Sequence, residues 1–91
     1  MADIVRSSFT GTGTSDPITG RYITIQLNFG TGSVDVEELI SGTTYIKIPE
    51  GTGVIADYTQ TYGHPDGPIM TLRLNCTSYT AEIAYVMKAA H

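Results

Sequence analysis

Apolar and polar side chains alternate without exception in the segment from Tyr22 to Phe29. Successive side chains of an extended strand point to opposite faces, so the alternation gathers the apolar residues on one face: Ile23, Ile25, Leu27 and Phe29. A strand of this kind has one face to bury and one that water can wet, which is typical of an antiparallel sheet. The segment therefore predicts a strand that is half buried in a β-sheet.

The rest of the chain continues in short β-branched and aromatic runs, which glycine, aspartate, asparagine and proline separate. Further strands are expected at residues 4–9, 33–40, 44–48, 54–58, 69–76 and 80–88. Six to seven short strands at this spacing are typical of a small antiparallel β-sandwich or barrel. We therefore expect an all-β fold in which residues 1–91 form a single β-sandwich domain.

Glycine-rich segments suggest how the strands connect. The tripeptide Gly30-Thr31-Gly32 lies between two apolar runs and predicts a hairpin connection between the strands on either side. A longer loop is expected at residues 60–68, which contain two glycines and two prolines. Both predictions depend on glycine, which adopts turn conformations that other residues avoid.

The apolar pattern slips out of phase in the expected strand at residues 33–40. Val34 and Val36 would share one face, but the alternation breaks at Glu37-Glu38. An extra residue in one strand of an antiparallel pair produces such a slip. The pattern therefore predicts a β-bulge at the two glutamates.

The last apolar segment, residues 80–88, fits two structures. A strand would group Ile83 with Tyr85 and Met87. A helix would instead group Ile83 with Val86 and Met87, and the alanines of this segment are good helix formers. A strand is favoured, because a single final helix would leave the sheet without its last partner and tertiary context often overrides propensity.

The start of the chain lacks the regular pattern. The expected strand at residues 4–9 alternates only weakly, and the connector at residues 10–17 contains glycines and a proline that argue against regular pairing. Residues 1–16 are therefore a candidate N-terminal arm and linker. An edge strand before a flexible linker is suited to adding onto a neighbouring sheet, so the candidate partner contacts are the apolar side chains of this arm: Ile4, Val5 and Phe9.

The length of 91 residues suits one domain with a small core. A chain of this size buries only about 60–65% of the surface that it exposes when unfolded. Disulfides stabilise many such domains, but Cys76 is the only cysteine, so no intramolecular disulfide can form. We therefore expect assembly into a homo-oligomer, or docking on a partner protein, to supply additional stability.

The net charge of −4 and the scattered lysines and arginines argue against a nucleic-acid partner. Clustered cations supply most non-specific affinity for phosphate backbones, and an anionic membrane surface is disfavoured for the same reason. No stretch has the length of a membrane span, and residues 1–6 have no apolar core of a secretory signal. We therefore expect a protein made in a cytoplasm, with neither nucleic acid nor membrane as a partner.

Two groups of ionisable residues could carry chemistry. His64 with Asp66 could form part of a metal or acid–base site, but their Gly-His-Pro-Asp-Gly setting favours a turn, and a metal site normally needs three or more ligands. Asp35, Glu37 and Glu38 could form a paired-carboxylate or calcium site. A solvated strand face that discourages aggregation is favoured instead, because no second acidic cluster has suitable spacing.

The remaining candidates for chemistry also favour a structural explanation. Cys76 lies in phase with Leu72 and Leu74, so we expect a small core side chain and not a nucleophile. The Gly-Thr-Gly segments at 11–13 and 51–53 lack the lysine and the helix of a phosphate-binding loop. An enzyme is not expected, and neither a metal nor a cofactor is.

Tyrosine is the most frequent aromatic residue, with six copies, whereas tryptophan is absent. Tyrosine-rich faces can bind proteins or sugars, but the same residues also pack at sheet edges with each hydroxyl reaching water or backbone. Sugar-binding platforms favour tryptophan. If the tyrosines form a binding face, we therefore expect a protein partner ahead of a sugar.

Three stretches that together span nearly the whole chain carry a resemblance: Ser8–Ser15, Gly32–Glu38 and Leu72–Thr80. The first is a glycine-rich turn before an alternating strand, and the second has the sequence Gly-Ser-Val-Asp-Val-Glu-Glu. The third contains Leu-Arg-Leu-Asn-Cys, which a tyrosine follows. In these features the chain resembles a group of small bacteriophage and prophage virion proteins, although Leu72 stands where that group has tyrosine. The resemblance implies a strand for the last segment and a structural role such as capsid decoration, often as trimers that cross-link capsomers.

The expected function is that of a virion structural protein, which decorates or cements a phage capsid through contacts with the major capsid protein or another virion protein. A homotrimer is favoured, and the expected location is the virion after assembly in the host cytoplasm. The alternative is a carbohydrate- or receptor-binding β-sandwich module of a phage tail or surface, which the tyrosines and polar loops suggest. An enzyme would need a nucleophile, a base and an orienting group, which two histidines and one core cysteine do not supply.

Overall fold

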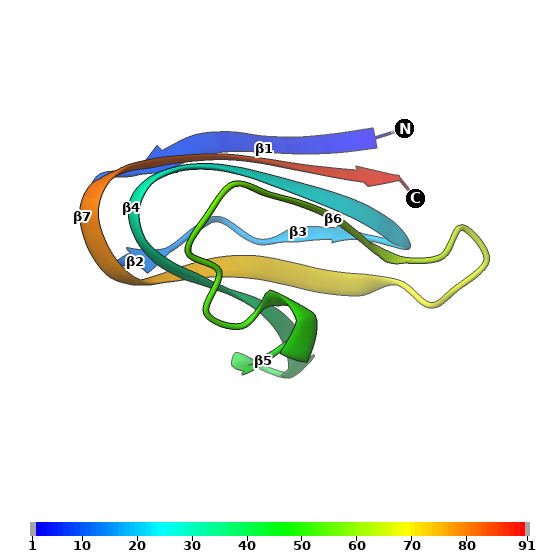
Figure 1. Ribbon diagram of the computed structural model, residues 1–91. Coiled ribbons are helices and arrows are strands. Elements are labelled where there is room, and N and C mark those ends of the chain that lie inside the picture. The colour runs from blue at the N-terminus through cyan, green and yellow to red at the C-terminus, as the bar shows by residue number, and fades with distance from the viewer. Residues whose placement is uncertain (1, 91) are drawn as a thin grey trace.

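Two long strands, β4 (Tyr22–Ser41) and β7 (Met70–Ala90), form the frame of the molecule. The computed structural model describes residues 2–90, with side chains from residue 4 onward. The two strands run antiparallel and pair along most of their length. Both strands bend at the same level, so each folds back over itself (Figure 1). One antiparallel sheet thereby forms two facing layers.

Five shorter strands complete the sheet: β1 (Ala2–Phe9), β2 (Gly13–Thr14), β3 (Ile18–Gly20), β5 (Thr44–Lys47) and β6 (Tyr58–Gly63). A 3-10 turn, η1 (Pro49–Gly51), follows β5. The upper layer in Figure 1 has the order β1, residues 79–90 of β7, residues 22–32 of β4, and β6. The lower layer has β2 and β3 beside residues 70–78 of β7, followed by residues 33–41 of β4 and then β5.

The fold class predicted from the sequence is confirmed, because the described residues form a small antiparallel all-β sandwich without an α-helix. The predicted strands at 22–29 and 33–40 are the two halves of β4. Those at 69–76 and 80–88 are the two halves of β7, so the ambiguous last segment is a strand. The described residues contain no helix with the length and apolar character that a membrane crossing requires.

Glycines in β4 allow the bend, because side chains there would collide with β7. A Cβ atom at Gly30 would lie 2.5 Å from the carbonyl oxygen of Glu82, and one at Gly32 would overlap the carbonyl oxygen of Ser78. The register between the strands shifts twice at this level, each time leaving one residue of β7 without an opposite residue in β4. Such bulges bend a strand and increase its twist.

The hairpin predicted at Gly30-Thr31-Gly32 is therefore wrong. The chain does not reverse there but passes from the upper layer to the lower one while it stays paired with β7 (Figure 1). A glycine-rich tripeptide between two apolar runs is compatible with either structure. The close approach of the β7 backbone decides between them, and that approach is a long-range contact.

The β-bulge predicted at Glu37-Glu38 is also wrong. Both glutamates keep a regular register with β7, and the irregularity lies between Leu39 and Ser41, where β4 pairs with β5. The side chain of Glu37 forms an ion pair with Arg73 on β7, at 2.8 Å, which fits a regular register at this point. The slip in the apolar pattern comes instead from Glu38, a polar residue at a position on the strand face of Val34 and Val36.

The strand predicted at residues 54–58 is wrong as well. Val54 forms only an isolated bridge with Val34, and β6 instead occupies part of the loop expected at 60–68. There β6 pairs with the open edge of β4. Backbone pairing with a long neighbouring strand thus outweighs the turn-forming composition around it.

The N-terminal connector also takes part in the sheet. Within residues 10–17, which were expected to lack regular pairing, Gly13 and Thr14 form β2 opposite Cys76 and Asn75 of β7. The prediction of an irregular connector is wrong for these two residues, because the free edge of β7 supplies partners for their backbone groups.

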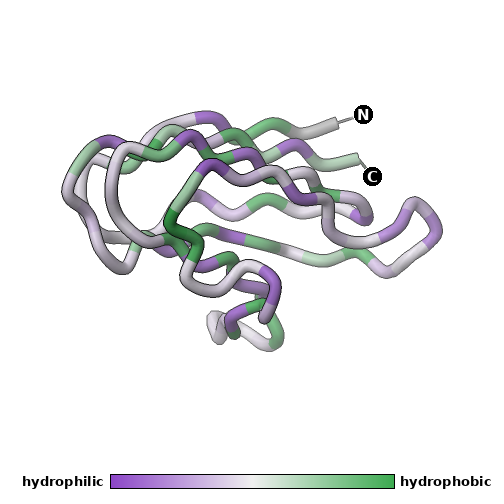
Figure 2. Tube along the Cα trace, in the orientation of Figure 1, coloured by the Kyte–Doolittle hydropathy of each residue, from purple (hydrophilic) through white to green (hydrophobic). Residues whose placement is uncertain are grey.

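The hydrophobic core lies between the two layers. In Figure 2, hydrophobic and hydrophilic residues alternate along the strands, so each strand turns one face toward the other layer. The buried hydrophobic side chains come from both layers: Phe9, Ile18, Ile23, Ile25, Leu27, Val34, Val36, Tyr62, Leu72, Leu74, Cys76, Ile83, Tyr85, Met87 and Ala89. The four apolar residues of the first alternating segment all contact or belong to this core.

Replacing Gly32 with alanine tests the role of the bend. The new Cβ would overlap the Ser78 carbonyl oxygen, and the φ of +155° is unfavourable for a side chain. We expect the free energy of unfolding to fall by about 2–3 kcal/mol in urea denaturation. Gly11→Ala is the matched control, since nothing lies within 4 Å of its Cβ position. Equal urea midpoints for the two variants would contradict this account of the bend.

Candidate functional site

The acidic side chains of β4 lie on the outer face of the lower layer. Asp35 and Glu37 point away from the core, whereas their neighbours Val34 and Val36 are fully buried in it. The prediction that the two carboxylates share one strand face is confirmed. The prediction of a solvated face is wrong, because only 3% of Asp35 and 7% of Glu37 is exposed.

Asp35 is covered by groups from the loop beyond β5. Its Oδ1 accepts a hydrogen bond of 2.7 Å from the backbone N–H of Gly53. Its Oδ2 lies 3.5 Å from the Nζ of Lys47, whose own side chain remains largely exposed. One carboxylate thus ties the segment after β5 to the middle of β4.

Glu37 is held by β7. The Arg73 Nε donates a hydrogen bond of 2.8 Å to its Oε1, and the Asn75 Nδ2 donates one of 3.2 Å to its Oε2. The guanidinium carbon of Arg73 also lies 3.7 Å from the centroid of the Tyr45 ring, a cation–π contact. A buried charge is tolerated only when it is paired and hydrogen-bonded, and both conditions hold here.

This arrangement gives the acidic residues a structural role. The oxygens of Asp35 and Glu37 already bind partners within the chain, and the structure describes no group of three or more histidine, cysteine, aspartate or glutamate side chains that could hold a metal ion. Glu38 takes the next position along β4 and so points to the opposite side. The cross-strand pairs therefore hold β4, β5 and β7 together.

A double-mutant cycle tests this role. Arg73→Met leaves Glu37 buried without its cation, so we expect the free energy of unfolding to fall by about 2–4 kcal/mol. The double variant Glu37→Met with Arg73→Met removes both charges, and we expect it to be more stable than Arg73→Met alone. Chemical denaturation measures both. A double variant whose loss equals the sum of the two single losses would contradict the proposed coupling.

His64 and Asp66 lie in an exposed turn between β6 and β7. The backbone N–H of Asp66 donates to the His64 Nδ1 at 3.1 Å, and that of Gly67 donates to the His64 carbonyl oxygen at 2.9 Å. The Arg21 Nη1 holds the end of the turn through the Gly67 carbonyl oxygen at 2.6 Å. The prediction of a turn is confirmed.

Cys76 and two tyrosines place ionisable groups in the core. The prediction that Cys76 is a core residue is confirmed by its exposed fraction of 1%, and burial raises the pKa of its thiol. Burial also raises the pKa of Tyr62 far above the usual range, and a hydrogen bond with the Tyr58 hydroxyl acts in the same direction. The pKa of Tyr85 is raised, again chiefly by burial. All three groups are therefore held in their neutral forms.

These shifts predict loss of stability at alkaline pH. A folded-state pKa above the unfolded value stabilises the protein below the unfolded value, and that contribution disappears as the pH rises. We expect the free energy of unfolding to decline from about pH 8.5, where unfolded cysteine ionises, and more steeply above about pH 10. Urea denaturation from pH 7 to 11 measures the decline, which should be shallower for Tyr62→Phe. An unchanged slope in that variant would contradict the assignment.

The candidate partner contacts of the N-terminal arm lie on β1, which pairs with β7 along its full length. Ile4 is 54% exposed, Val5 packs partly against the core, and Phe9 is buried. The Phe9 ring lies 4.9 Å, centroid to centroid, from the ring of Tyr85. Ile4 is thus the residue of the three that a partner could reach without displacing β1.

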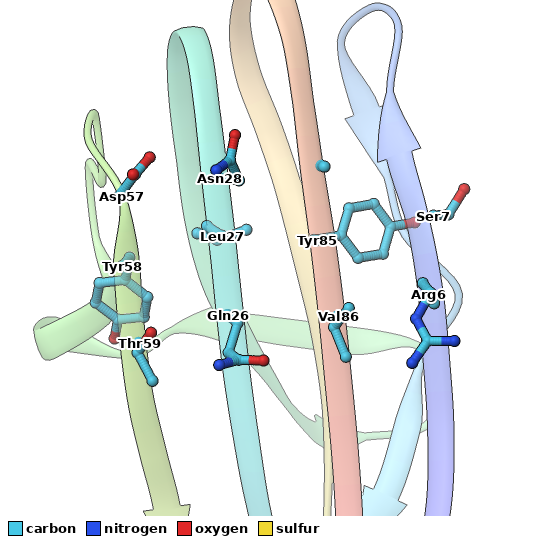
Figure 3. Close-up of a pocket in the computed structure, with 11 residues that line it drawn as sticks. Arg6, Ser7, Gln26, Leu27, Asn28, Asp57, Tyr58, Thr59, Tyr85 and Val86 are labelled. Atoms are coloured by element: carbon cyan, nitrogen blue, oxygen red, sulfur yellow. The ribbon is translucent and has the colours of Figure 1, made fainter.

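An open hollow of about 490 Å³ lies on the upper layer and is lined by all four of its strands (Figure 3). One row of directly opposed residues crosses it: Arg6 of β1, Val86 of β7, Gln26 of β4 and Thr59 of β6. Asn28 and Ala84 form the neighbouring pair toward the bend. Because the alternate residues of β4 and β7 are buried, this row faces away from the core.

The sequence contained part of the signal for this hollow. The polar positions of the first alternating segment, which include Gln26 and Asn28, predicted an outer strand face. The positions of Arg6 and Val86 beside them depend on the pairing of β1 and β4 with the same strand, β7. No local pattern specifies that register, so the hollow was not predicted.

Comparison with known proteins finds no family model, no curated protein and no solved structure that matches this chain.

Proposed function

We propose that this chain is a structural protein of a virion, which decorates or cements a phage capsid through contacts with the major capsid protein or another virion protein. The observation that carries the proposal is the open surface of the upper layer, where a four-stranded sheet face and the edge strand β1 are uncovered within the described residues. The resemblance of three stretches to small virion proteins supports the same role.

The free edge of β1 suits addition to a neighbouring sheet. This strand has eight residues and contains neither proline nor lysine, which commonly protect edges from pairing, and its charged residues are Asp3 and Arg6. By comparison, β5 has only four residues, includes Lys47 and precedes Pro49. The strand β1 thus offers the longest free edge for main-chain pairing with a partner. Pairing of a strand with a free sheet edge is a common mode of protein recognition.

The size of the chain supports a role in which contact area matters more than chemistry. Specific interfaces bury about 800 Å² on each partner, and the total exposed surface of this structure is 5036 Å². A stable contact would therefore engage a substantial share of the molecule. Several copies on one lattice would add their weak contacts through avidity.

Substituting Ile4 tests the proposed contact at β1. Its side chain is exposed, so Ile4→Ser should leave the fold intact, and we expect it to reduce co-sedimentation with capsids assembled from the accompanying major capsid protein, because it removes an apolar contact without changing the charge. Ile55→Ser is the matched control, because Ile55 is 72% exposed and lies outside β1. Deletion of the residues before Thr10 should abolish co-sedimentation, but it also removes Phe9 from the core, so its folding must be verified by circular dichroism.

Unchanged co-sedimentation of Ile4→Ser and of the folded truncated protein would contradict a contact at β1. Absence of capsid binding by the wild-type chain would contradict the proposed function itself. A glycan array distinguishes the alternative, because specific sugar binding by a protein that ignores capsids would favour a carbohydrate-binding module.

A further inference from the structure

The two cations beside the hollow differ from the other three in the chain, which has five lysines and arginines in total. Lys47 pairs with a carboxylate, Arg73 does the same, and Arg21 binds a backbone carbonyl oxygen. Arg6 and Lys88 make no ion pair with any side chain that the structure describes. Among the described side chains, Arg6 and Lys88 are thus the two cations with neither an ion pair nor a side-chain hydrogen bond, and both lie on one face.

Arg6 and Lys88 are close neighbours on that face. Arg6 of β1 lies opposite Val86 of β7, and Lys88 is two residues further along β7. Such diagonal positions in an antiparallel pair have Cα atoms about 7–8 Å apart. Both residues are exposed, and like charges at this spacing repel each other. An anion that contacts both would relieve the repulsion.

Two carboxylates lie at the end of this face near the bend, away from Lys88, and one of them, Asp57, lines the hollow. Glu82 accepts a hydrogen bond of 2.8 Å from the Ser8 hydroxyl, at the end of the layer near the bend. Asp57 accepts one of 2.9 Å from the backbone N–H of Phe29. Neither carboxylate forms an ion pair with Arg6 or Lys88, so no described acidic side chain neutralises these two cations.

The hollow itself combines a small apolar floor with hydrogen-bonding walls. Ala84 and Val86 lie on the central strand β7, and the amide side chains of Gln26 and Asn28 lie beside them on β4. Amides both donate and accept hydrogen bonds, as a polypeptide backbone requires. The volume of about 490 Å³ is in the range of ligand sites and is open to solvent along the sheet.

We propose that this hollow binds an acidic polypeptide segment, in which carboxylates contact Arg6 and Lys88 while an apolar side chain rests on Val86. In an extended segment, side chains two residues apart lie on one face at about 6.6 Å, which matches the diagonal spacing of the two cations. The inference rests on the proposed function only in that the partner is a protein. It adds the chemistry of that partner and the surface that receives it.

A polypeptide fits the hollow better than a sugar does. Sugar sites usually offer an exposed aromatic ring for stacking, but Tyr85 is only 7% exposed and Tyr58 is half-buried with its hydroxyl bonded to that of Tyr62. A nucleic acid would meet the net charge of −4 of the whole chain. The positive charge at the end with Arg6 and Lys88 instead suits a partner that brings only a few carboxylates.

NMR titration of the full, isotope-labelled chain tests the proposal. The probe is a short peptide of alternating glutamate and threonine, and the matched control peptide has glutamine in place of each glutamate. We expect the acidic peptide to shift the amide signals of Gln26, Val86 and Lys88, and to do so less as salt is added. The control peptide should leave these signals in place.

Variants of the chain locate the contact. Arg6→Gln and Lys88→Gln should each weaken binding of the acidic peptide by about two- to fivefold, the range for exposed ion pairs. Lys47→Gln removes the same charge from an exposed lysine outside the hollow and should leave the affinity unchanged. An equal loss of affinity in all three variants would mean that the peptide responds only to the net charge of the chain. That result would overturn the assignment of binding to the hollow.

Two further outcomes would overturn the inference. One is binding of an oligomer of galacturonic acid at these residues without binding of the acidic peptide, which would indicate an acidic sugar site. The other is the absence of shifts with either probe. Capsid co-sedimentation without peptide binding would overturn only the assignment of the hollow, whereas peptide binding without co-sedimentation would overturn the capsid proposal.

Discussion

The pairing between β4 and β7 determines the rest of the structure. These two strands remain in register on both sides of their common bend, and every other strand adds to one of their edges. The bend folds one sheet into two layers whose apolar faces meet. It requires that the backbones approach closely, which a side chain at Gly30 or Gly32 would prevent. The architecture of the sandwich thus depends on two positions without a Cβ atom.

The same pairing gives the two outer faces different character. On the lower layer, cross-strand ion pairs bury Asp35 and Glu37 and engage Lys47 and Arg73, so the charges of this face satisfy one another. On the upper layer the row across the hollow is mostly neutral, and the cations Arg6 and Lys88 lack acidic partners among the described side chains. A face whose charges are paired internally contributes to stability. A face whose charges are unpaired is better suited to recognition.

The sequence was sufficient to predict the fold class and most of the core. Alternation identified the first half of β4 and the first half of β7, since burial of one strand face imposes a period of two whatever the neighbours are. The second halves were also predicted as strands, but the pattern of one slipped out of phase and that of the other also fitted a helix. Alternation also placed Cys76 in the core, and the glycine and proline residues around His64 placed it in a turn, because both features depend on local patterns.

Features that depend on long-range pairing were not predictable in the same way. The bend at Gly30–Gly32 was taken for a hairpin, because local composition does not reveal which strand runs alongside. The burial of Asp35 and Glu37 was missed, because Lys47 and Arg73 become their partners only once β5 and β7 flank β4. The upper hollow depends likewise on the register of three strands with their neighbours.

NMR measurement of contacts across the bend tests the central claim most directly. If β4 and β7 stay paired, nuclear Overhauser effects should connect Thr31 with Ala81 and Ser33 with Ser78. Contacts between residues 22–29 and 33–40 as adjacent antiparallel strands, without those to β7, would indicate a hairpin at the glycines. That result would contradict the bent pair and the two-layer arrangement that depends on it.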